Sequence, residues 1–147
     1  ENPLLIGRGI GIAPLLYLAK QIYAKGIKPD VLLGFRSKEQ MIALDEFEKY
    51  SNLYISTQDG SIGEKGLVTE NKIFLASHDV IYTCGPTPMM KAIAEHALKN
   101  NTECFASLEN KMACGIGACL CCVQNTTEGH KCTCTEGPVF NVKDIIW

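Results

Sequence analysis

Residues 4–14 read LLIGRGIGIAP, an apolar run that enters a glycine-rich turn and then a helical pattern. A short buried strand followed by glycines and a helix is typical of the first unit of a parallel α/β sheet. The helix is predicted from Pro14 to about Lys25, because proline loses no hydrogen bond in a first helical turn and Gly26 can end the helix. Its inward face would carry Leu15, Leu18, Ala19 and Ile22.

The alternation of apolar runs and helical patterns continues to about residue 108. We expect strands at 4–6, 31–35, 53–56, 80–83 and 104–108. We expect helices at 14–25, 38–50 and 88–99, and a short one at 68–74. This alternation predicts an α/β fold with a five-stranded parallel nucleotide-binding sheet flanked by helices.

The pattern changes after residue 108, where cysteine, glycine and threonine become frequent and no helical period remains. We therefore divide the chain into an α/β domain at 1–108 and a small Cys-rich module at 109–147. A segment this short cannot bury a sufficient core alone, so a bound metal group is expected to organise it. Segments 123–126 and 131–135 could pair as a short β-hairpin around Glu128 and Gly129.

Four cysteines of this module have an informative spacing. Cys114, Cys119 and Cys122 form a C-x4-C-x2-C pattern, and Cys134 follows later. This is the plant-type spacing of [2Fe-2S] ligands, in which one loop supplies three thiolates. Gly115 and Gly117, which lie within that loop, would let backbone N–H groups approach the sulfur atoms. A one-electron centre in a short chain indicates electron transfer.

Two other interpretations of the cysteines remain open. A structural zinc site could use four thiolates, and a disulfide framework is compatible with an even count of eight. The zinc set would be Cys119, Cys122, Cys132 and Cys134. In the iron–sulfur interpretation Cys121 and Cys132 are spare and have a packing role by default.

The glycine-rich turn is a candidate nucleotide site, because backbone N–H groups at the start of a helix can bind a pyrophosphate. Its residues differ from the G-x-G-x-x-G pattern, since Ile12 stands at the third glycine position, and strand two ends in Gly34-Phe35-Arg36-Ser37 rather than in an acid. A plain tight turn therefore remains the alternative. The candidate contacts here are Gly7, Gly9, Gly11, Pro14 and Arg36.

Two further strand ends carry candidate nucleotide contacts, because ligands of open parallel sheets lie at the carboxyl ends of the strands. Strand three is followed by Thr57, Asp59 and Gly60, and strand four by Cys84, Gly85 and Pro86. Asp59 could accept from ribose hydroxyls and repel a 2′-phosphate, which favours NAD over NADP. The alternatives are an Asp-Gly turn and a buried strand-end thiol.

Composition excludes several classes of partner. The net charge is −2 and there is no basic stripe, so we expect no binding to nucleic acid. No apolar run approaches the length of a membrane span, and no signal peptide is present, so we expect a cytoplasmic protein without membrane contact.

Three segments in order, 7–14, 57–66 and 84–90, resemble the nicotinamide-binding domain of the ferredoxin–NADP reductase superfamily. Segments 107–119 and 134–140 narrow the resemblance to the electron-transfer subunits of bacterial NAD-dependent dihydroorotate dehydrogenases. The resemblance implies NAD, FAD and a [2Fe-2S] cluster as cofactors. It also implies that the cluster ligands are Cys114, Cys119, Cys122 and Cys134.

The resemblance further implies a role in pyrimidine biosynthesis. Electrons would pass from an FMN-containing dihydroorotate dehydrogenase subunit through the cluster and FAD to NAD, in a heterotetramer. The alternative is a reductase subunit of another NAD(P)-linked complex, such as a ferredoxin–NADP transhydrogenase, a hydrogenase or a sulfide dehydrogenase. The chain starts without Met at Glu1, so we expect a C-terminal piece that lacks the FAD-binding barrel and is inactive alone. Arg8 and Cys121 depart from the family pattern.

Overall fold

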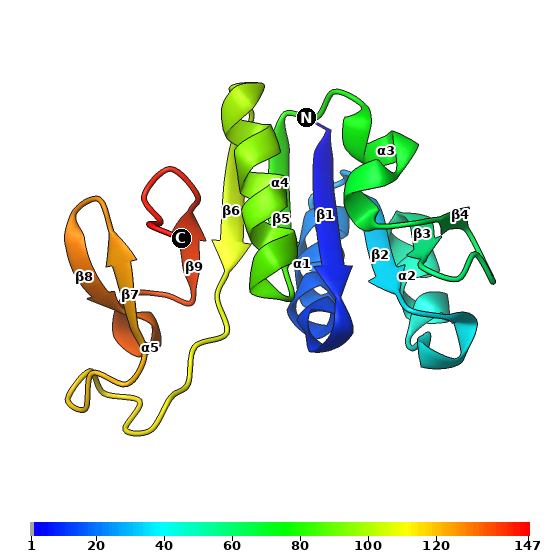
Figure 1. Ribbon diagram of the computed structural model, residues 1–147. Coiled ribbons are helices and arrows are strands. Elements are labelled where there is room, and N and C mark those ends of the chain that lie inside the picture. Colours follow the sequence, from blue (N-terminus) through cyan, green and yellow to red (C-terminus); the bar gives the residue numbers. More distant parts are fainter. Residues whose placement is uncertain (1) are drawn as a thin grey trace.

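A computed structural model describes residues 2–147, and these form one mixed sheet of seven strands in the order β4-β3-β2-β1-β5-β6-β9, together with a separate hairpin (Figure 1). Six neighbouring strands are parallel and β9 is antiparallel to β6. The strands of the sheet are β1 (Pro3–Arg8), β2 (Asp30–Phe35), β3 (Asn52–Thr57), β4 (Glu64–Lys65), β5 (Val80–Cys84), β6 (Glu103–Ser107) and β9 (Val139–Asn141).

The sheet confirms the five predicted parallel strands and adds two short edge strands. Strand β4 lies inside the glycine-rich loop after β3, where Ser56 is paired with Glu64. Strand β9 comes from the Cys-rich segment, and its Phe140 lies opposite Ala106 of β6. Phe140, Val142 and Ile145 are buried in the same apolar cluster as β6. The end of the chain therefore shares a core with the α/β part. The division at residue 108 stays a prediction.

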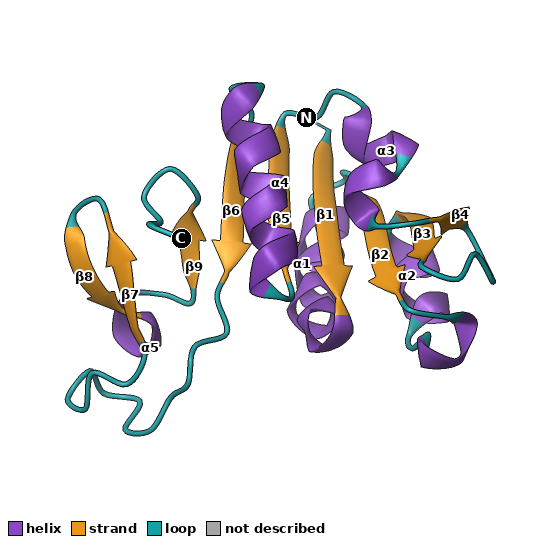
Figure 2. Ribbon diagram, in the orientation of Figure 1, coloured by secondary structure: helices purple, strands orange, loops and turns teal. Residues whose placement is uncertain are grey.

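Helices cover both faces of the sheet (Figure 2). Helices α1 (Ile12–Ala24) and α2 (Leu44–Tyr50) pack on one face, in a cluster that includes Leu15, Phe47 and Leu33. Helices α3 (Lys72–Leu75) and α4 (Thr87–Lys99) pack on the other face. Strand side chains alternate between the two faces of the sheet, so consecutive residues of a buried strand pack into the apolar clusters on opposite faces.

Two predicted helices are divided in the structure. The helix expected at 38–50 consists of a 3-10 turn, η2 (Lys38–Gln40), and the later α2, because Ala43 has a left-handed φ of 58°. The helix expected at 68–74 likewise separates into η3 (Val68–Glu70) and α3. There the Asn71 side chain accepts from the N–H of Ile73 and starts a new helix. Helix α1 starts at Ile12, directly after the 3-10 turn η1 (Gly9–Gly11).

The Cys-rich segment forms a long loop, a hairpin and one helical turn. The hairpin pairs β7 (Val123–Thr126) with β8 (Gly129–Cys132), so its second strand lies earlier than the predicted 131–135. Residues Thr133–Glu136 instead form the short helix α5. The hairpin is held to the chain end by the N–H of Ile146, which donates to the carbonyl of Asn125 over 3.0 Å. Within the described residues, none of the helices has the length and apolar character that a bilayer crossing requires.

Candidate cofactor-binding sites

The first candidate site lies at the carboxyl ends of β1, β2 and β5. A cavity of about 580 Å³ at this edge is lined by residues that include Gly9, Arg8, Arg36 and Pro86. Two guanidinium groups border this cavity, and its lining contains no carboxylate. Guanidinium groups bind phosphate oxygens through paired hydrogen bonds. The arrangement is therefore suited to an anion such as a pyrophosphate.

The three glycines of the first turn have different structural roles. Gly9 has a φ of 62° and open space around its Cα, so it provides the left-handed turn. A Cβ on Gly7 would lie 2.7 Å from the Leu15 side chain, and one on Gly11 would lie 2.3 Å from the carbonyl oxygen of Cys84. Gly7 and Gly11 therefore allow α1 to lie close against β1 and β5, and of these three glycines Gly9 lines the cavity.

Cys84 and Pro14 border a neighbouring cavity of about 270 Å³, together with Gly11 and Glu109. The Cys84 thiol is buried, and this burial raises its pKa, while a hydrogen bond to Ser107 acts in the opposite direction. The thiol is therefore protonated at neutral pH, and Cys84 lies between the apolar cluster beneath α1 and this cavity. Gly85 and Pro86 line a third cavity of about 330 Å³ on the side of the Cys-rich segment.

The candidates after β3 form a turn. Thr57 is fully buried, and its hydroxyl donates to the carbonyl of Ile62 over 2.6 Å. One oxygen of Asp59 accepts from the Ser61 hydroxyl over 2.7 Å and from the Ser61 N–H over 2.9 Å. These bonds lower the pKa of Asp59. Gly60 has a φ of 78°. These three residues do not line the cavities described above.

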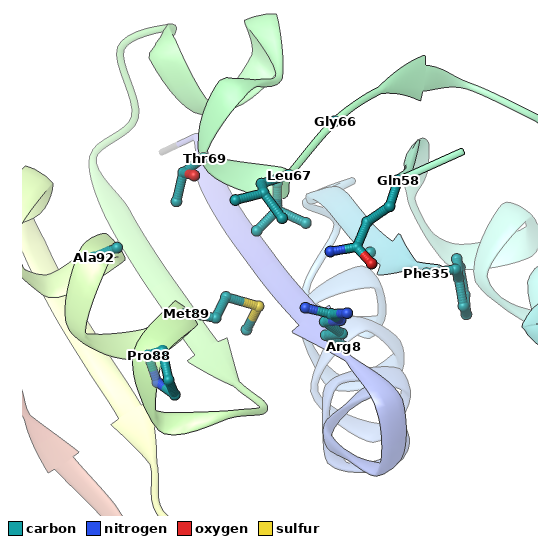
Figure 3. Close-up of a pocket in the computed structure, with 11 residues that line it drawn as sticks. Arg8, Phe35, Gln58, Gly66, Leu67, Thr69, Pro88, Met89 and Ala92 are labelled. Atoms are coloured by element: carbon teal, nitrogen blue, oxygen red, sulfur yellow. The ribbon is translucent and has the colours of Figure 1, made fainter. Parts of the chain in front are cut away.

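Sequence reasoning missed Gln58, which lies between two of these candidates. Its side chain, with those of Arg8 and Met89, lines a cavity of about 160 Å³ beside η3 and α4 (Figure 3). Strand alternation gives no signal for Gln58, because β3 ends at Thr57 and its last two residues, Ser56 and Thr57, are both buried. Arg8 borders this cavity and two of the others, so it lies at the centre of the cavities at the carboxyl ends of the strands.

The second candidate site is the cysteine loop. The Cys114 thiol accepts from the N–H groups of Ile116 and Cys119, each over 3.4 Å, and the Cys122 thiol accepts from the N–H of Cys134 over 3.4 Å. Gly115 and Gly117 have φ values of 71° and 75°, which the tight loop requires. The four predicted ligands therefore form two pairs, Cys114 with Cys119 and Cys122 with Cys134.

The thiols of this loop differ in exposure and acidity. Cys122 is buried, Cys119 and Cys121 are exposed, and Cys114, Cys132 and Cys134 are half-buried. Hydrogen bonding from the backbone of Cys121 is the largest cause that lowers the pKa of Cys119 to about 6. A thiol with a low pKa is readily available as a thiolate ligand.

The cysteines fit a two-iron cluster by donor type and by pairing. Among residues 2–147, no group of three or more Cys, His, Asp or Glu side chains is placed to hold one metal ion. A [2Fe-2S] cluster needs four thiolates shared between two irons, and backbone N–H groups that donate to its sulfur atoms tune it. The two thiol pairs and their N–H donors match that requirement.

Comparison with protein families matches both parts of the chain. Residues 5–95 match the oxidoreductase NAD-binding domain, and residues 109–146 match the iron–sulfur cluster binding domain of dihydroorotate dehydrogenase B. The first match spans all the α/β candidate residues, and the second spans Cys114, Cys119, Cys122 and Cys134.

Individual relatives agree with these matches. The chain is 42% identical to a dihydroorotate dehydrogenase B (NAD(+)) electron transfer subunit from Fusobacterium nucleatum, over 99% of this chain and 58% of that protein. It is 43% identical to the subunit of the same name from Caldanaerobacter subterraneus, over 100% of this chain and 60% of that protein. The chain thus spans about three fifths of the length of these relatives.

Solved structures show the same arrangement. An NADH-dependent reduced ferredoxin-NADP oxidoreductase superposes with a TM-score of 0.88 at 35% identity, over 99% of this chain and 54% of that one. The C-terminal domain of a hydrogenase from Pyrococcus furiosus superposes with a TM-score of 0.56 at 18% identity, over 73% of this chain and 91% of that one. The second likeness concerns the fold alone.

Proposed function

Because this chain belongs to the oxidoreductase NAD-binding domain family, we propose that it is the NAD-binding and cluster-binding part of a dihydroorotate dehydrogenase electron-transfer subunit. The match of residues 109–146 to the iron–sulfur domain of dihydroorotate dehydrogenase B supports the specific assignment. One observation supports this proposal most directly. The thiols of Cys114 and Cys122 accept hydrogen bonds from backbone N–H groups, and they lie on a segment that shares its apolar core with the NAD-binding sheet.

The strand-end cavities would bind the nicotinamide nucleotide. Arg8 and Arg36 would hold the pyrophosphate, and the left-handed turn at Gly9 would leave room for it. Cys84, Gly85 and Pro86 would position the nicotinamide ring at the end of β5. The buried, protonated Cys84 thiol would contact the ring without placing a charge beside it.

The cysteine loop would hold the cluster on the segment that borders this nucleotide site. The cavity lined by Gly85 and Pro86 is also lined by Glu109, Asn110 and Gln124 of the Cys-rich segment, so one cavity touches both parts. A [2Fe-2S] cluster, when bound, supplies one-electron chemistry. N–H donation from Ile116, Cys119 and Cys134 would stabilise the more negative, reduced form.

The complete system would need parts outside this chain. We propose FAD, bound by another part of the full-length polypeptide, as the acceptor that exchanges hydride with NAD. The partner would be an FMN-containing dihydroorotate dehydrogenase subunit in a heterotetramer that serves pyrimidine biosynthesis. A cytoplasmic location agrees with the cysteines, all of which are free thiols in the described residues.

Metal analysis of anaerobically purified protein tests the proposal. We expect about two irons and about two acid-labile sulfides per chain, with the red-brown colour of a [2Fe-2S] protein. Zinc without iron would contradict it. Purification with native partners should then recover a subunit that contains FMN and oxidises dihydroorotate when NAD is supplied.

A second candidate is a subunit of a ferredoxin–NADP transhydrogenase. The superposition at a TM-score of 0.88 on an NADH-dependent reduced ferredoxin-NADP oxidoreductase favours this candidate. The same purification separates the two, because a partner that reacts with ferredoxin and not with dihydroorotate would identify the transhydrogenase.

A further inference from the structure

Two spare thiols of the cysteine loop occupy different surroundings. Cys121 is exposed and interacts with Cys119. Cys132 is half-buried at the end of β8, and its thiol lies 4.0 Å from the carbonyl oxygen of Gly117, in the middle of the cluster loop. The side chain of Cys132 is therefore directed toward the predicted cluster site, although it is outside the four-ligand pattern.

The surroundings of Cys132 resemble those of Cys134. The N–H of Cys134 donates to the Cys122 thiol over 3.4 Å, and burial together with the neighbouring Cys122 raises the pKa of the Cys132 thiol. The Cys132 thiol lies 4.0 Å from the carbonyl oxygen of Gly117. Interaction with Cys122 raises the pKa of the Cys134 thiol, and the backbone of Gly117 acts in the opposite direction. Two sulfur atoms thus lie beside one residue of the loop, Gly117, and share Cys122 as a neighbour.

The local backbone allows either thiol to face the loop. Cys132 ends β8, and Cys134 lies in the single turn of α5, which starts at Thr133. The N–H of Cys132 donates to a carboxylate oxygen of Glu136 over 2.7 Å, which fixes the start of this turn. The N–H of Thr133 donates to the carbonyl of Cys122 over 3.0 Å, so both cysteines stay beside Cys122.

We propose that Cys132 is a reserve ligand of the iron–sulfur cluster, able to replace Cys134 at the iron that Cys122 also binds. The inference rests on the proposed function, because it needs a cluster in this loop. The Cys132 thiol would release its proton to solvent when it binds iron, and a displaced Cys134 thiolate would take one up. The number of ligands and their charge are kept, so no oxidant or reductant is involved. The site would retain its cluster when Cys134 is lost or modified.

The test uses alanine variants, since alanine cannot bind iron. Cys134→Ala should keep at least about half of the wild-type iron and sulfide, with a [2Fe-2S] absorption spectrum. The double variant Cys132→Ala/Cys134→Ala should contain at least about tenfold less iron per chain than the wild-type protein. Cys121→Ala/Cys134→Ala is the matched control, because it also removes one spare thiol, and it should retain the cluster as Cys134→Ala does.

Alkylation mapping gives a second readout that does not depend on how the double variant folds. While the cluster is bound, ligand thiols should resist N-ethylmaleimide. Cys132 should react in the wild-type protein and be protected in Cys134→Ala. Loss of the cluster from Cys134→Ala would overturn the inference, and so would retention in Cys132→Ala/Cys134→Ala. Absence of iron from the wild-type protein would instead contradict the proposed function.

Discussion

The backbone at Gly11 touches the backbone at Cys84, since a Cβ atom on Gly11 would lie 2.3 Å from the Cys84 carbonyl oxygen and 2.7 Å from the Gly85 nitrogen. This contact joins the start of α1 to the end of β5. It places the glycine turn directly beside the Cys84-Gly85-Pro86 turn. The two proposed halves of the nucleotide site are therefore held together by main-chain packing.

Gly11→Ala should consequently destabilise the fold more than Gly9→Ala does. The added methyl group meets backbone atoms that cannot rotate away, at a cost on the order of 1–3 kcal/mol or more. At Gly9 the methyl group meets open space and only the positive φ is penalised, by about 1–2 kcal/mol. Urea unfolding of both variants measures the difference. Equal losses would show that the contact at Gly11 relaxes freely.

Thiol reactivity should divide the cysteines into two groups in metal-free protein. Burial raises the pKa of Cys104 to about 12, and burial also raises the pKa of Cys84, so little thiolate is present at either site at pH 8. Cys119, with a pKa of about 6, should react first. Iodoacetamide labelling followed by peptide mass spectrometry checks the order. Early labelling of Cys104 in folded protein would contradict it.

Single alanine variants of two cysteines in the same loop should distinguish a cluster ligand from a spare thiol. Cys114→Ala should remove the visible absorption, because two N–H groups that donate to this thiol lose their acceptor together with the proposed ligand. Cys121→Ala should keep the absorption, since the exposed Cys121 is outside the predicted ligand set. Iron analysis of both proteins makes the comparison quantitative. A colourless Cys121→Ala protein would reverse this assignment.

Much of the fold is predictable because the buried strands of a parallel sheet are nearly continuous apolar runs. Strand β2 is buried along its whole length, and the predicted run at 31–35 lies inside it. The edge strand β9 is not predictable in this way, since only Phe140 of its three residues is buried. The break at Ala43 also gives no local signal, because alanine favours helix and its positive φ depends on tertiary packing.

The candidate sites show a similar division. Spacing alone predicts the four ligand cysteines, because ligand spacing is a local property of the loop, and this assignment stays a prediction. Spacing could not distinguish Gly9 from Gly11, since their roles depend on the distance to β5. Nor could it place Thr57, whose hydroxyl is used by the turn at Ile62. Contacts between distant segments decide these roles, so they required the structure.

Loss of one arginine should weaken nucleotide binding regardless of which nicotinamide nucleotide is used. Arg8 borders three of the cavities at the strand ends, so Arg8→Ala should raise the Kd for NADH by about tenfold, as expected for a lost charge-assisted contact. Lys28→Ala is the control, because this exposed lysine precedes β2 at the opposite edge of the sheet. Fluorescence titration gives both constants. An unchanged Kd for Arg8→Ala would remove Arg8 from the site.

Asp59 does not line the strand-end cavities, so we expect its charge to act on the 2′-position of a bound nucleotide from outside them and to favour NADH over NADPH. The pKa of Asp59 is lowered by hydrogen bonds from Ser61, so its carboxylate is charged at neutral pH and would repel a 2′-phosphate. Asp59→Asn keeps an oxygen that can accept from Ser61 and removes only the charge. We expect NADPH to bind about fivefold more tightly relative to NADH, because the charges are exposed and partly screened. Titration with both nucleotides at low and high salt measures this ratio, and a salt-independent, unchanged ratio would leave Asp59 with its turn role alone.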